Sequence, residues 1–251
     1  MRIVATIQAR MGSTRLPGKV LMPIVGKPML ALQVERIRQS ILIDDVVIAT
    51  TTNAGDDAVE RVADELGVGC YRGSEADVLS RVIEALKAFA ADVNVEFMAD
   101  NPIPDPLLVD SIVGFFLKNA DRFDYVTNAL RTTYPPGAEV HVYPVDTLFD
   151  VGEHVDDPAL REHVGIHITQ NPDRYRIHNL EAPPWYHAPD IHLEVDTPED
   201  FEVVSAVYEH FYPRSPGFTL AEVLGFLREH PEIARRNRDV ERRWAAFRQD
   251  H

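Results

Sequence analysis

Three positively charged side chains stand close together near the start of a chain that is otherwise acidic. Arg10, Arg15 and Lys19 fall within ten positions, whereas the 251 residues include 40 acidic and 25 basic side chains, with a formal charge of −15. Gly12 and Gly18 in the same stretch allow backbone N–H groups to approach an anion closely. Solvated cations on a surface turn are the plainer interpretation, but so much positive charge in an acidic chain favours a triphosphate-binding loop.

This stretch does not match the two common glycine-rich phosphate motifs. Lys19 is followed by Val20, where a Walker loop has Ser or Thr. Gly12 and Gly18 are six positions apart, which does not fit G-x-G-x-x-G. Phosphate binding therefore rests here on charge and on exposed backbone amides.

Two aspartates are candidates for holding a metal ion beside that loop. Asp100 follows an apolar run at 93–98, and Asp196 ends another run at 192–196. A divalent cation that bridges phosphates takes oxygen ligands, commonly one or two carboxylates. Asp100 could also be a plain turn residue, and Asp196 could cap the following helix, although Thr197 could take that cap instead.

The elements that would position these side chains alternate between strands and helices. Apolar, β-branched runs predict strands, and amphipathic runs of ten or more residues predict helices. This alternation predicts a mostly parallel sheet covered on both faces, with ligands beyond the carboxyl ends of its strands. The predicted strands are Arg2–Ala9, Asp45–Thr50, Val68–Arg72, Val93–Met98, Asp124–Asn128 and His192–Asp196, and the predicted helices are Pro28–Gln39, Asp56–Leu66, Glu75–Ala90, Leu107–Lys118 and Pro198–His210.

The middle of the chain departs from the alternating pattern. Residues 131–191 are rich in proline and histidine, and their strand candidates are Glu139–Tyr143 and Arg174–Asn179. Because the regular α/β pattern resumes afterwards, we interpret this segment as an insertion of mixed character.

The end of the chain reads as a helical extension. A break at Pro213–Pro216 precedes two predicted helices, Leu220–Arg228 and Glu232–Arg248. The predicted organisation is therefore a main domain over residues 1–212 and a C-terminal extension over 213–251.

Composition narrows the possible partners and the compartment. A strongly acidic surface repels nucleic acid and anionic membranes at long range. Cys70 is the single cysteine, so no intrachain disulfide can form, and the sequence shows no signal peptide or long apolar run. We expect a soluble cytoplasmic protein that binds neither nucleic acid nor membrane. Its hydrophobic residues make up 45% of the sequence, which is enough to fill a core.

Several stretches resemble one enzyme family, in the order in which that family has them. The longest is "IQARMGSTRLPGKVLMPIVGKPML" at residues 7–30; the others are "VVIATTTNAGDDAV", "YRGSEADVLSRVIEA", "ADNPIPDPLLVD", "YVTNALRTTYPPGAEV", "REHVGIHITQNPDRYRI", "VDTPEDFEVV" and "LREHPEIARRN". Over nearly its whole length the chain resembles the SpsF-type cytidylyltransferases of spore-coat polysaccharide synthesis. Their relatives activate acylneuraminate and 3-deoxy-octulosonate sugars.

This resemblance implies a three-layer, Rossmann-like nucleotidyltransferase fold in which the middle segment is a dimerisation arm. It implies CTP as donor, Mg²⁺ as cofactor, a sugar acid or related hydroxy compound as acceptor, and a homodimer. Asp100 and Asp196 match the two aspartates that bind the family's metal. For the nucleotide the resemblance points to Ala9, Gly12, Ser13, Arg72 and Ser74, and for the acceptor, or for the dimer arm, to Glu139, Arg161, Glu162 and His163.

The chemistry of such a transfer suits the charged loop. Attack of a hydroxyl on the α-phosphorus of CTP releases pyrophosphate, and the step needs charge neutralisation and positioning more than covalent help. Arg10, Arg15 and Lys19 suit the leaving phosphates. Arg72 could donate to the cytosine carbonyl, or it could be an exposed arginine at a strand end.

The chain departs from the family where the walls of the pocket are expected. Glu96 and Met98 replace Arg and Thr beside the first aspartate, and His192 and Glu194 replace Arg and Thr beside the second. The family's "Gly-x-Asp-x-Glu" region reads Gly137–His141 here. These changes put the acceptor in doubt more than the phosphate and metal residues.

Two interpretations of the glutamates remain open from the sequence. If Glu96 and Glu194 line the pocket, the acceptor should be neutral or amine-bearing, because a carboxylate favours an arginine partner. An acid group could still be met by Arg131, Arg161 or His163. Alternatively, both glutamates point away and pair with surface arginines.

Two further patterns are weaker. His163 and His167 are four apart and could share a helix face, but without H-E-x-x-H they do not predict a zinc site. Five arginines at 235–243 could indicate a nucleic-acid patch. We interpret them instead as a solvated helix face whose Trp244 and Phe247 pack on the body.

Two other functions compete with nucleotidyl transfer. A glycosyltransferase of related fold would carry Asp-x-Asp after a strand, but the chain reads Ala-Asp-Asn-Pro at Asp100. A degenerate, nucleotide-binding family member without activity is the second competitor, and release of pyrophosphate from CTP would distinguish it from an enzyme.

Overall fold

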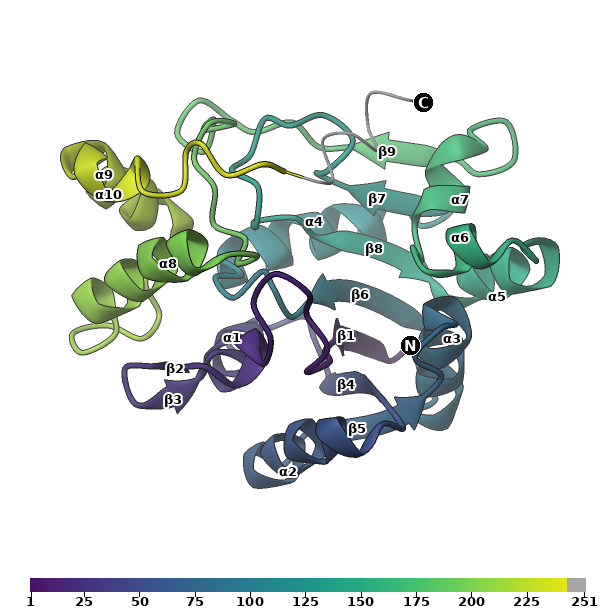
Figure 1. The fold of residues 1–251 in the computed structure, drawn as a ribbon. Helices are drawn as coiled ribbons and strands as arrows, with labels where there is room; N and C mark the ends of the chain where they lie inside the picture. Colours follow the sequence, from purple (N-terminus) through teal and green to yellow (C-terminus); the bar gives the residue numbers. More distant parts are fainter. Residues whose placement is uncertain (243–251) are drawn as a thin grey trace.

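A seven-stranded sheet forms the centre of the protein, whose computed structural model describes residues 1–242. The strands are Ile3–Gln8 (β1), Asp45–Thr51 (β4), Gly69–Gly73 (β5), Val93–Met98 (β6), Tyr125–Thr127 (β7), His141–Pro144 (β8) and Ile177–Asn179 (β9). Their order across the sheet is β5-β4-β1-β6-β8-β7-β9 (Figure 1).

The predicted mostly parallel sheet is confirmed. Strands β5, β4, β1 and β6 run parallel, β8 is antiparallel to both β6 and β7, and β7 is parallel to β9. In β1 the run Ile3–Ile7 is buried throughout, as expected of a strand covered on both faces.

Helices connect the strands and cover both faces of the sheet. The longer ones are Met29–Ile37 (α1), Asp57–Leu66 (α2), Val78–Ala88 (α3), Pro106–Lys118 (α4), Val145–His154 (α5), Pro198–Phe211 (α8) and Leu220–Glu229 (α9). Shorter elements are the 3₁₀ turns Lys19–Leu21 and Ala54–Asp56, the small hairpin of Pro23–Ile24 (β2) with Lys27–Pro28 (β3), and the helices Pro158–Arg161 (α6), Ile166–Gln170 (α7) and Pro231–Ala234 (α10).

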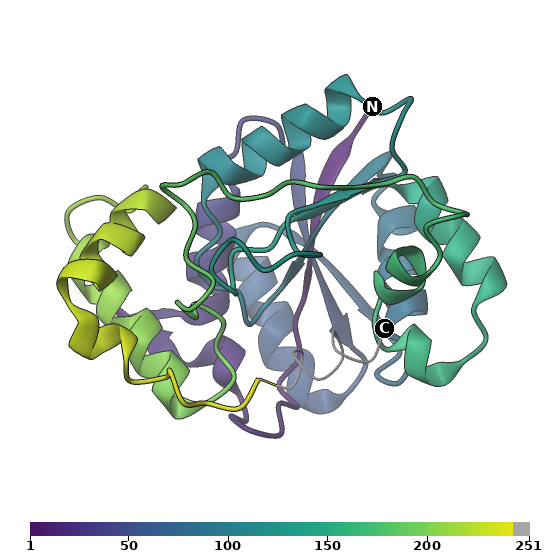
Figure 2. The ribbon, with the colours of Figure 1, turned by 90° about the horizontal axis from the view of Figure 1, so that it is seen from above.

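Two hydrophobic layers result, one on each face of the sheet. The larger layer packs α1, α2, α4, α8 and α9 against alternate strand residues such as Ala5, Ile7 and Phe97. On the other face, α3 and α5 pack against residues such as Val4 and Tyr143. Figure 2 shows the separation, with the yellow C-terminal helices on the side of the sheet opposite the teal-green α5–α7 region.

The segment 131–191 contributes two strands to this same sheet. Strand β8 lies between β6 and β7, and β9 forms the edge beside β7. The sequence predicts an insertion of mixed character, and in the structure its two strands run in opposite directions within the main sheet. A role of the segment in dimerisation stays a prediction.

The strand predicted at His192–Asp196 is wrong. This segment belongs to no ladder, because its backbone N–H groups bond to loops. Leu193 N donates to Pro136 O at 2.7 Å, and Val195 N donates to Asp100 O at 2.8 Å.

A glycine makes room for that segment. Gly137 has φ 100°, and a Cβ placed there would lie 2.4 Å from the backbone N of Glu194. Only glycine combines this backbone conformation with so close an approach. This close approach of Gly137 to the backbone of residues 193 and 194 helps to fix the position of Asp196, two residues further on.

The helix predicted at Glu232–Arg248 is also wrong for its described part. Only Pro231–Ala234 is helical, and residues 235–242 continue without a helix; Trp244 and Phe247 lie outside the described residues. Arg242 is not on a solvated face, since its side chain is 7% exposed and pairs with Glu194 and Asp200.

Candidate active site

A lysine from the first loop lies between the two aspartates that follow the sheet. Lys19 Nζ is 2.9 Å from Asp196 Oδ1 and 3.3 Å from Asp100 Oδ2, and it donates to Val195 O at 2.7 Å. The Lys19 side chain is only 10% exposed. Residues far apart in sequence thus form one cluster of opposite charges, which we call the Lys19 cluster.

Arg15 completes the Lys19 cluster. Its Nη2 is 2.5 Å from Asp196 Oδ2, so Asp196 receives one cation on each carboxylate oxygen. The sequence prediction that cations and aspartates meet at one edge is met by Arg15, Lys19, Asp100 and Asp196, while Arg10 stands apart.

The turn that carries Asp100 is held by a buried glutamine. Gln33 on α1 donates through Nε2 to Met98 O at 2.8 Å and to Asn101 O at 2.9 Å. Gln33 is fully buried, so these bonds are shielded from water and keep the turn at the end of β6 in one position. Burial raises the pKa of the Asp100 carboxyl, and the Lys19 ammonium acts in the opposite direction.

The Asp196 turn is held by the start of α8. Thr197 is the N-cap of this helix and forms a capping box with Asp200. Asp200 Oδ2 also accepts from Asp196 N at 3.0 Å and from Thr197 N at 2.9 Å. Asp196 is therefore not the helix cap, and its side chain is directed to Lys19 and Arg15.

The loop between β1 and Lys19 is built around the backbone of Met11. Asp56 accepts from Met11 N at 2.7 Å, while Met11 O accepts from Ser13 N and Gly18 N. Gly18 has φ 73°, a left-handed conformation that side chains disfavour. Ala9, at the start of the loop, is buried and donates to Ala49 O.

Arg10 faces a different carboxylate from Arg15 and Lys19. Its Nη1 lies 3.9 Å from Glu75 Oε1, and Glu75 Oε2 accepts from Asn53 at 2.7 Å. A Cβ at Gly12 would be 3.7 Å from Glu75 Oε1, the oxygen that faces Arg10. Glu75 therefore joins the first loop to the turn that follows β5.

Arg72 does not have the contacts expected of a residue that reads the base. Its Nε and Nη2 donate to Thr51 O and Asn53 O, and its Nη1 contacts Asp57 and Glu60. Every nitrogen of the guanidinium thus has a partner, and α2 provides the two carboxylates. Donation from Arg72 to a cytosine carbonyl would require one of these partners to be released, and it stays a prediction.

A buried arginine that the sequence reasoning missed lies beneath the same turn. Arg81 on α3 is 3% exposed and donates through Nη1 to Ser74 O at 2.7 Å. Burial lowers the pKa of this guanidinium, and the charge of Arg10 nearby adds to the effect. The position of Arg81 in the amphipathic run after β5 was the available signal, but an arginine in a helix normally reads as exposed.

The family assignment follows from comparison with known proteins. The family described as Cytidylyltransferase matches residues 4–215. The chain belongs to the cytidylyltransferase family. It is 35% identical over 237 residues to the spore coat polysaccharide biosynthesis protein SpsF of Bacillus subtilis, covering 92% of this chain and 96% of that protein.

Two further relatives agree with this family. A cytidylyltransferase structure from Leptospira borgpetersenii superposes with a TM-score of 0.90 at 28% identity, covering 96% of this chain and all of that one. The 8-amino-3,8-dideoxy-manno-octulosonate cytidylyltransferase of Shewanella piezotolerans is 26% identical, covering 82% of this chain and 98% of that protein. The nucleotidyltransferase fold expected from the sequence is confirmed.

The oxygen atoms of the Lys19 cluster suit the metal that such cytidylyltransferases imply. The Lys19 ammonium is a cation held by Asp100, Asp196 and the carbonyl oxygen of Val195. Two carboxylates that already share one cation match the set that Mg²⁺ uses when phosphates and water complete its shell. Among residues 1–242, no group of three or more His, Cys, Asp or Glu side chains gathers as a metal site.

The residues expected around the acceptor are dispersed. Arg161 is engaged, because Nε and Nη2 both lie 2.9 Å from Asp77 Oδ2 and Nη1 donates to Val155 O. Glu139 accepts from Gly137 N and from Asn101, so it braces the Asp100 turn. Glu162 is exposed.

The predicted pairing of two histidines on one helix face is wrong. His163 lies in the turn between α6 and α7, whereas His167 lies within α7. A break in the helix therefore separates the two side chains.

The two unusual glutamates lie behind the site rather than in its wall. Glu194 is 5% exposed and contacts Arg242 at 3.3 Å and His192 at 3.4 Å. Glu96 is 6% exposed and accepts from Gln8 and Tyr143. The interpretation of an acidic pocket wall is therefore wrong. The alternative, that both glutamates point away from the pocket, agrees better with the structure. Of the two, only Glu194 contacts an arginine among residues 1–242, and Glu96 bonds to the neutral side chains of Gln8 and Tyr143.

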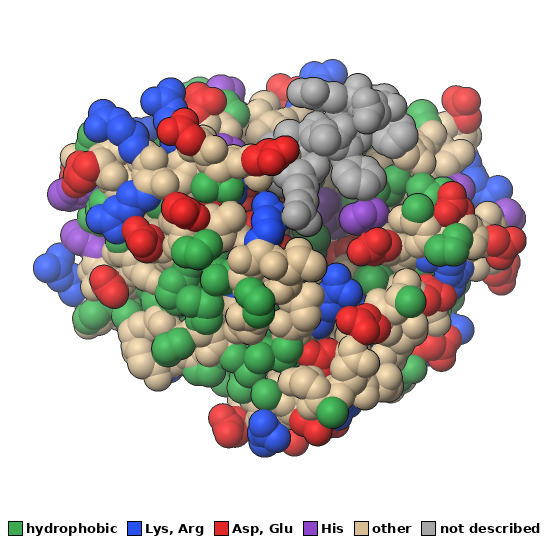
Figure 3. Space-filling view, viewed as in Figure 1, with side chains coloured by type: hydrophobic (Ala, Val, Ile, Leu, Met, Phe, Trp, Pro, Cys, Tyr) green, Lys and Arg blue, Asp and Glu red, His purple; other side chains and the backbone are tan. Residues whose placement is uncertain are grey.

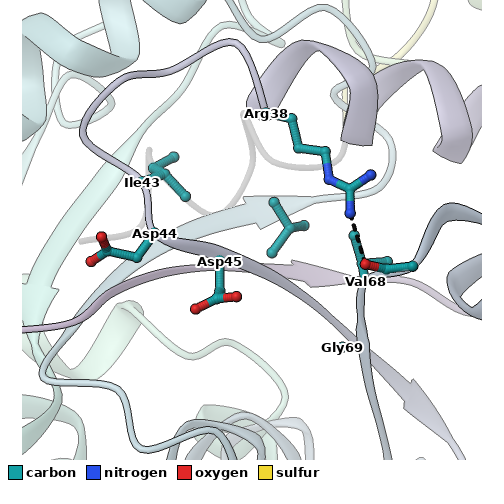
Figure 4. Close-up of a pocket in the computed structure, with 8 residues that line it drawn as sticks. Arg38, Ile43, Asp44, Asp45, Val68 and Gly69 are labelled. Atoms are coloured by element: carbon teal, nitrogen blue, oxygen red, sulfur yellow. Dashed lines mark hydrogen bonds between the residues drawn. The ribbon is translucent and has the colours of Figure 1, made fainter.

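Two hollows lie away from the Lys19 cluster. One, of about 190 Å³, is at the amino ends of the strands beside Asp44 and Asp45, where Arg38 caps the end of α2 (Figure 4). The other, of about 380 Å³, is an apolar groove lined by residues that include Leu107, Tyr134 and Trp185.

On the face drawn in Figure 3, acidic and basic side chains are interspersed. Within residues 1–242, no helix combines the length and hydrophobicity that a membrane span requires.

Proposed function

We propose that this cytidylyltransferase transfers CMP from CTP to a hydroxyl acceptor of the sugar-acid type. The acceptor oxygen forms a bond to the α-phosphorus, the bond from that phosphorus to the bridging oxygen breaks, and pyrophosphate leaves with the electron pair. The hydroxyl proton passes to water. The supporting observation is Lys19, held between two carboxylates directly after a loop that also supplies Arg15.

Asp100 and Asp196 would hold Mg²⁺ in this reaction. When bound, the metal supplies positive charge to the phosphate oxygens. Gln33 and Asp200 keep the two aspartate turns in place, so the carboxylates need little reorganisation. Such preorganisation is a main source of rate enhancement in charge-stabilising sites.

Arg15 and Lys19 would exchange partners when substrate binds. In the free protein both cations neutralise Asp196. With a triphosphate present they can turn to its oxygens, where charge develops on the leaving group. Arg10 would approach the same phosphates from the side of Glu75, with Gly12 and Ser13 offering backbone amides.

The base would lie against the first loop and the turn after β5. Ala9 and Ser74 border this region, and Arg81 fixes the Ser74 carbonyl from below. We assign cytosine recognition to backbone groups here and keep Arg72 as a second candidate, since its ion pairs with Asp57 and Glu60 can exchange as those of Arg15 and Lys19 do. CTP as donor is supported by the family and by the names of its relatives.

The biological setting follows from the same relatives. We propose a role in making activated precursors of surface polysaccharide in the cytoplasm, supported by the similarity to SpsF. The similarity to an octulosonate cytidylyltransferase makes sugar acids, with or without an amino group, candidate acceptors to be tested.

We further propose that a homodimer forms through the apolar groove. Leu107 and Trp185 are each 62% exposed there, and an exposed pair of Arg131 with Glu181 stands at its rim. A rim with both charges can complement itself across a two-fold axis. Light scattering on Trp185→Asp should show a monomer, and an unchanged dimer would move the interface elsewhere.

Thermal shift with Mg²⁺ and each of CTP, UTP, ATP and GTP tests the donor. A ligand that binds only the folded state raises the melting temperature, so CTP should give the largest shift. Equal shifts for all four nucleotides would contradict the cytidylyl assignment. Pyrophosphate release with nonulosonic and octulosonic acids, amino sugars and neutral sugars then separates an active enzyme from an inactive nucleotide-binding relative.

A further inference from the structure

A line of buried polar side chains crosses the sheet beneath the site. Thr6 Oγ1 donates to Asn94 Oδ1 at 2.9 Å, and Asn94 Nδ2 donates to the Tyr143 hydroxyl at 2.8 Å. Tyr143 donates to Glu96 Oε2 at 2.5 Å, and Gln8 Nε2 donates to Glu96 Oε1 at 2.6 Å. Thr6, Asn94, Glu96 and Tyr143 are each 6% exposed or less.

The hydrogen bonds in this line have a fixed direction. The Tyr143 hydroxyl accepts from Asn94, so its proton is directed to Glu96. Each oxygen of the Glu96 carboxylate then receives one donor, which favours the ionised form. Burial opposes this and raises the pKa of Glu96 to about 7.

Glu96 thereby fixes the orientation of the Gln8 amide. An ionised carboxylate only accepts hydrogen bonds, so Gln8 must turn its NH₂ group toward it. The Gln8 carbonyl oxygen is then directed away from Glu96. In the described part of the chain no donor contacts Gln8 Oε1, and this atom is not among the buried unpaired ones.

Gln8 is the last residue of β1, at the edge where ligands bind. It pairs with Ala49 of β4 on one side and with Met98 of β6 on the other. Met98 is 38% exposed, so the floor beside Gln8 is open. An accessible hydrogen-bond acceptor therefore stands in the middle of the site.

The order of strands places Gln8 between the two ends of the nucleotide. The base is assigned to the side of β5, by the Ser74 turn, and the phosphates to the side of β6, by Asp100. Strand β1 lies between β4 and β6, so the sugar that joins base to phosphate has to pass over the end of β1. This step rests on the proposed function.

We propose that Gln8 Oε1 accepts a hydrogen bond from the 2′- or 3′-hydroxyl of the CTP ribose and so favours CTP over the analogue that lacks that hydroxyl. Glu96 is the positioning residue, because it turns the amide of Gln8 into the accepting orientation. One neutral hydrogen bond of this kind corresponds to about two- to tenfold in affinity.

Binding measurements without an acceptor test this directly. Calorimetry with Mg²⁺ at pH 8.5 compares CTP, 2′-deoxy-CTP and 3′-deoxy-CTP on the wild-type chain and on Gln8→Leu. The wild-type chain should bind CTP about two- to tenfold more tightly than at least one deoxy analogue. Gln8→Leu should bring that ratio close to one by weakening the binding of CTP alone, whereas the matched control Gln39→Leu, in the exposed turn after α1, should keep it.

The positioning role of Glu96 has its own variant. In Glu96→Gln the new amide can donate to Gln8, which would then turn its NH₂ outward and lose the accepting oxygen. The CTP preference should fall as in Gln8→Leu, with the melting curve remaining cooperative. A preference retained in Glu96→Gln would overturn the positioning role.

The outcomes separate this inference from the proposed function. Tight CTP binding with an unchanged preference in Gln8→Leu would overturn the ribose assignment alone, and a raised acceptor KM in that variant would instead assign the contact to the acceptor's hydroxyl. Failure of every cytidine nucleotide to bind the wild-type chain would overturn the proposed function and this inference with it.

Discussion

Two neighbouring clusters contain nearly the same chemical groups and differ in exposure. The Lys19 cluster has the carboxylates of Asp100 and Asp196, whose side chains are 31% and 17% exposed. A second cluster, which we call the Arg242 cluster, joins Arg242 to Glu194 and Asp200, with exposures of 7%, 6% and 0%. The segment from Glu194 to Asp200 supplies carboxylates to both.

The difference teaches which ion pairs can exchange partners. In the Arg242 cluster no substrate can reach the carboxylates, so each charge depends on its present partner. In the Lys19 cluster water and ligands can reach the aspartates, and a metal or a phosphate can replace a cation. Exposure, more than residue type, separates the proposed active site from a structural pair a few residues away.

The largest expected effect tests the Lys19 cluster as a catalytic site. Asp196→Asn and Asp100→Asn should each lower turnover by at least about 10²- to 10³-fold, because a charge-stabilising group is lost. Pyrophosphate release measures this, and circular dichroism should show a retained fold. The exposed Asp190→Asn is the control; near-normal activity in Asp196→Asn would leave that residue with a structural role.

Removing the shared cation should have the next largest effect. Lys19→Ala should lower kcat and raise the KM for CTP, together about 10²-fold in kcat/KM, because the lysine contacts charge that develops on phosphate. Steady-state kinetics against Lys27→Ala, an exposed lysine paired with Glu35, provides the comparison. If Lys19→Ala changed the melting temperature alone, the loop would be structural.

The Arg242 cluster should respond in stability rather than in chemistry. Arg242→Leu removes the guanidinium that contacts two buried carboxylates, Glu194 and Asp200, and should lower the free energy of unfolding by about 3 kcal/mol. Urea unfolding measures the loss, and the exposed Arg228→Leu should change it by much less. A large fall in kcat for folded Arg242→Leu would contradict the purely structural role of the Arg242 cluster.

A smaller effect concerns Glu96, which is buried without a cation among its described contacts. Its pKa rises on folding from 4.5 to about 7, so the folded state binds the proton more tightly. The free energy of unfolding should therefore fall as pH rises from about 4.5 to about 7 and stay lower above that.

The variant Glu96→Gln lacks this titrating group. Between pH 4 and pH 8 its free energy of unfolding should therefore rise by about 2 to 3 kcal/mol relative to that of the wild type. Parallel denaturation series at both pH values measure the change; an equal difference at both would show that Glu96 does not titrate on folding.

The elements that rest on local pattern were predictable from the sequence. The apolar runs of β1, β4 and β6 and the amphipathic periods of α2 and α3 are local signals, and they gave the strands, helices and carboxyl edge nearly as observed. The first loop and Asp100 were also expected at the ligand-binding edge, since parallel strands present their ends there, and in the structure Lys19 contacts Asp100.

The parts that failed depend on long-range contacts. Residues 192–196 alternate like a strand, but their N–H groups bond to Pro136 and Asp100 in loops. Arg72 and Arg161 look free in the sequence because their partners come from α2 and from Asp77. Arg242 looks solvated until the chain folds back on Glu194. A single sequence contains no local signal for any of these pairings.

The backbone bond from Val195 N to Asp100 O has a consequence for heat inactivation. The two aspartates sit on separate turns, and this bond, with the Gly137 crossing, keeps the turns in register. A modest loosening of residues 191–197 would separate the carboxylates while the sheet remained intact. We expect the temperature at which activity disappears to lie below the melting temperature of the fold, so the working range of the enzyme would be set by one short strap rather than by its core.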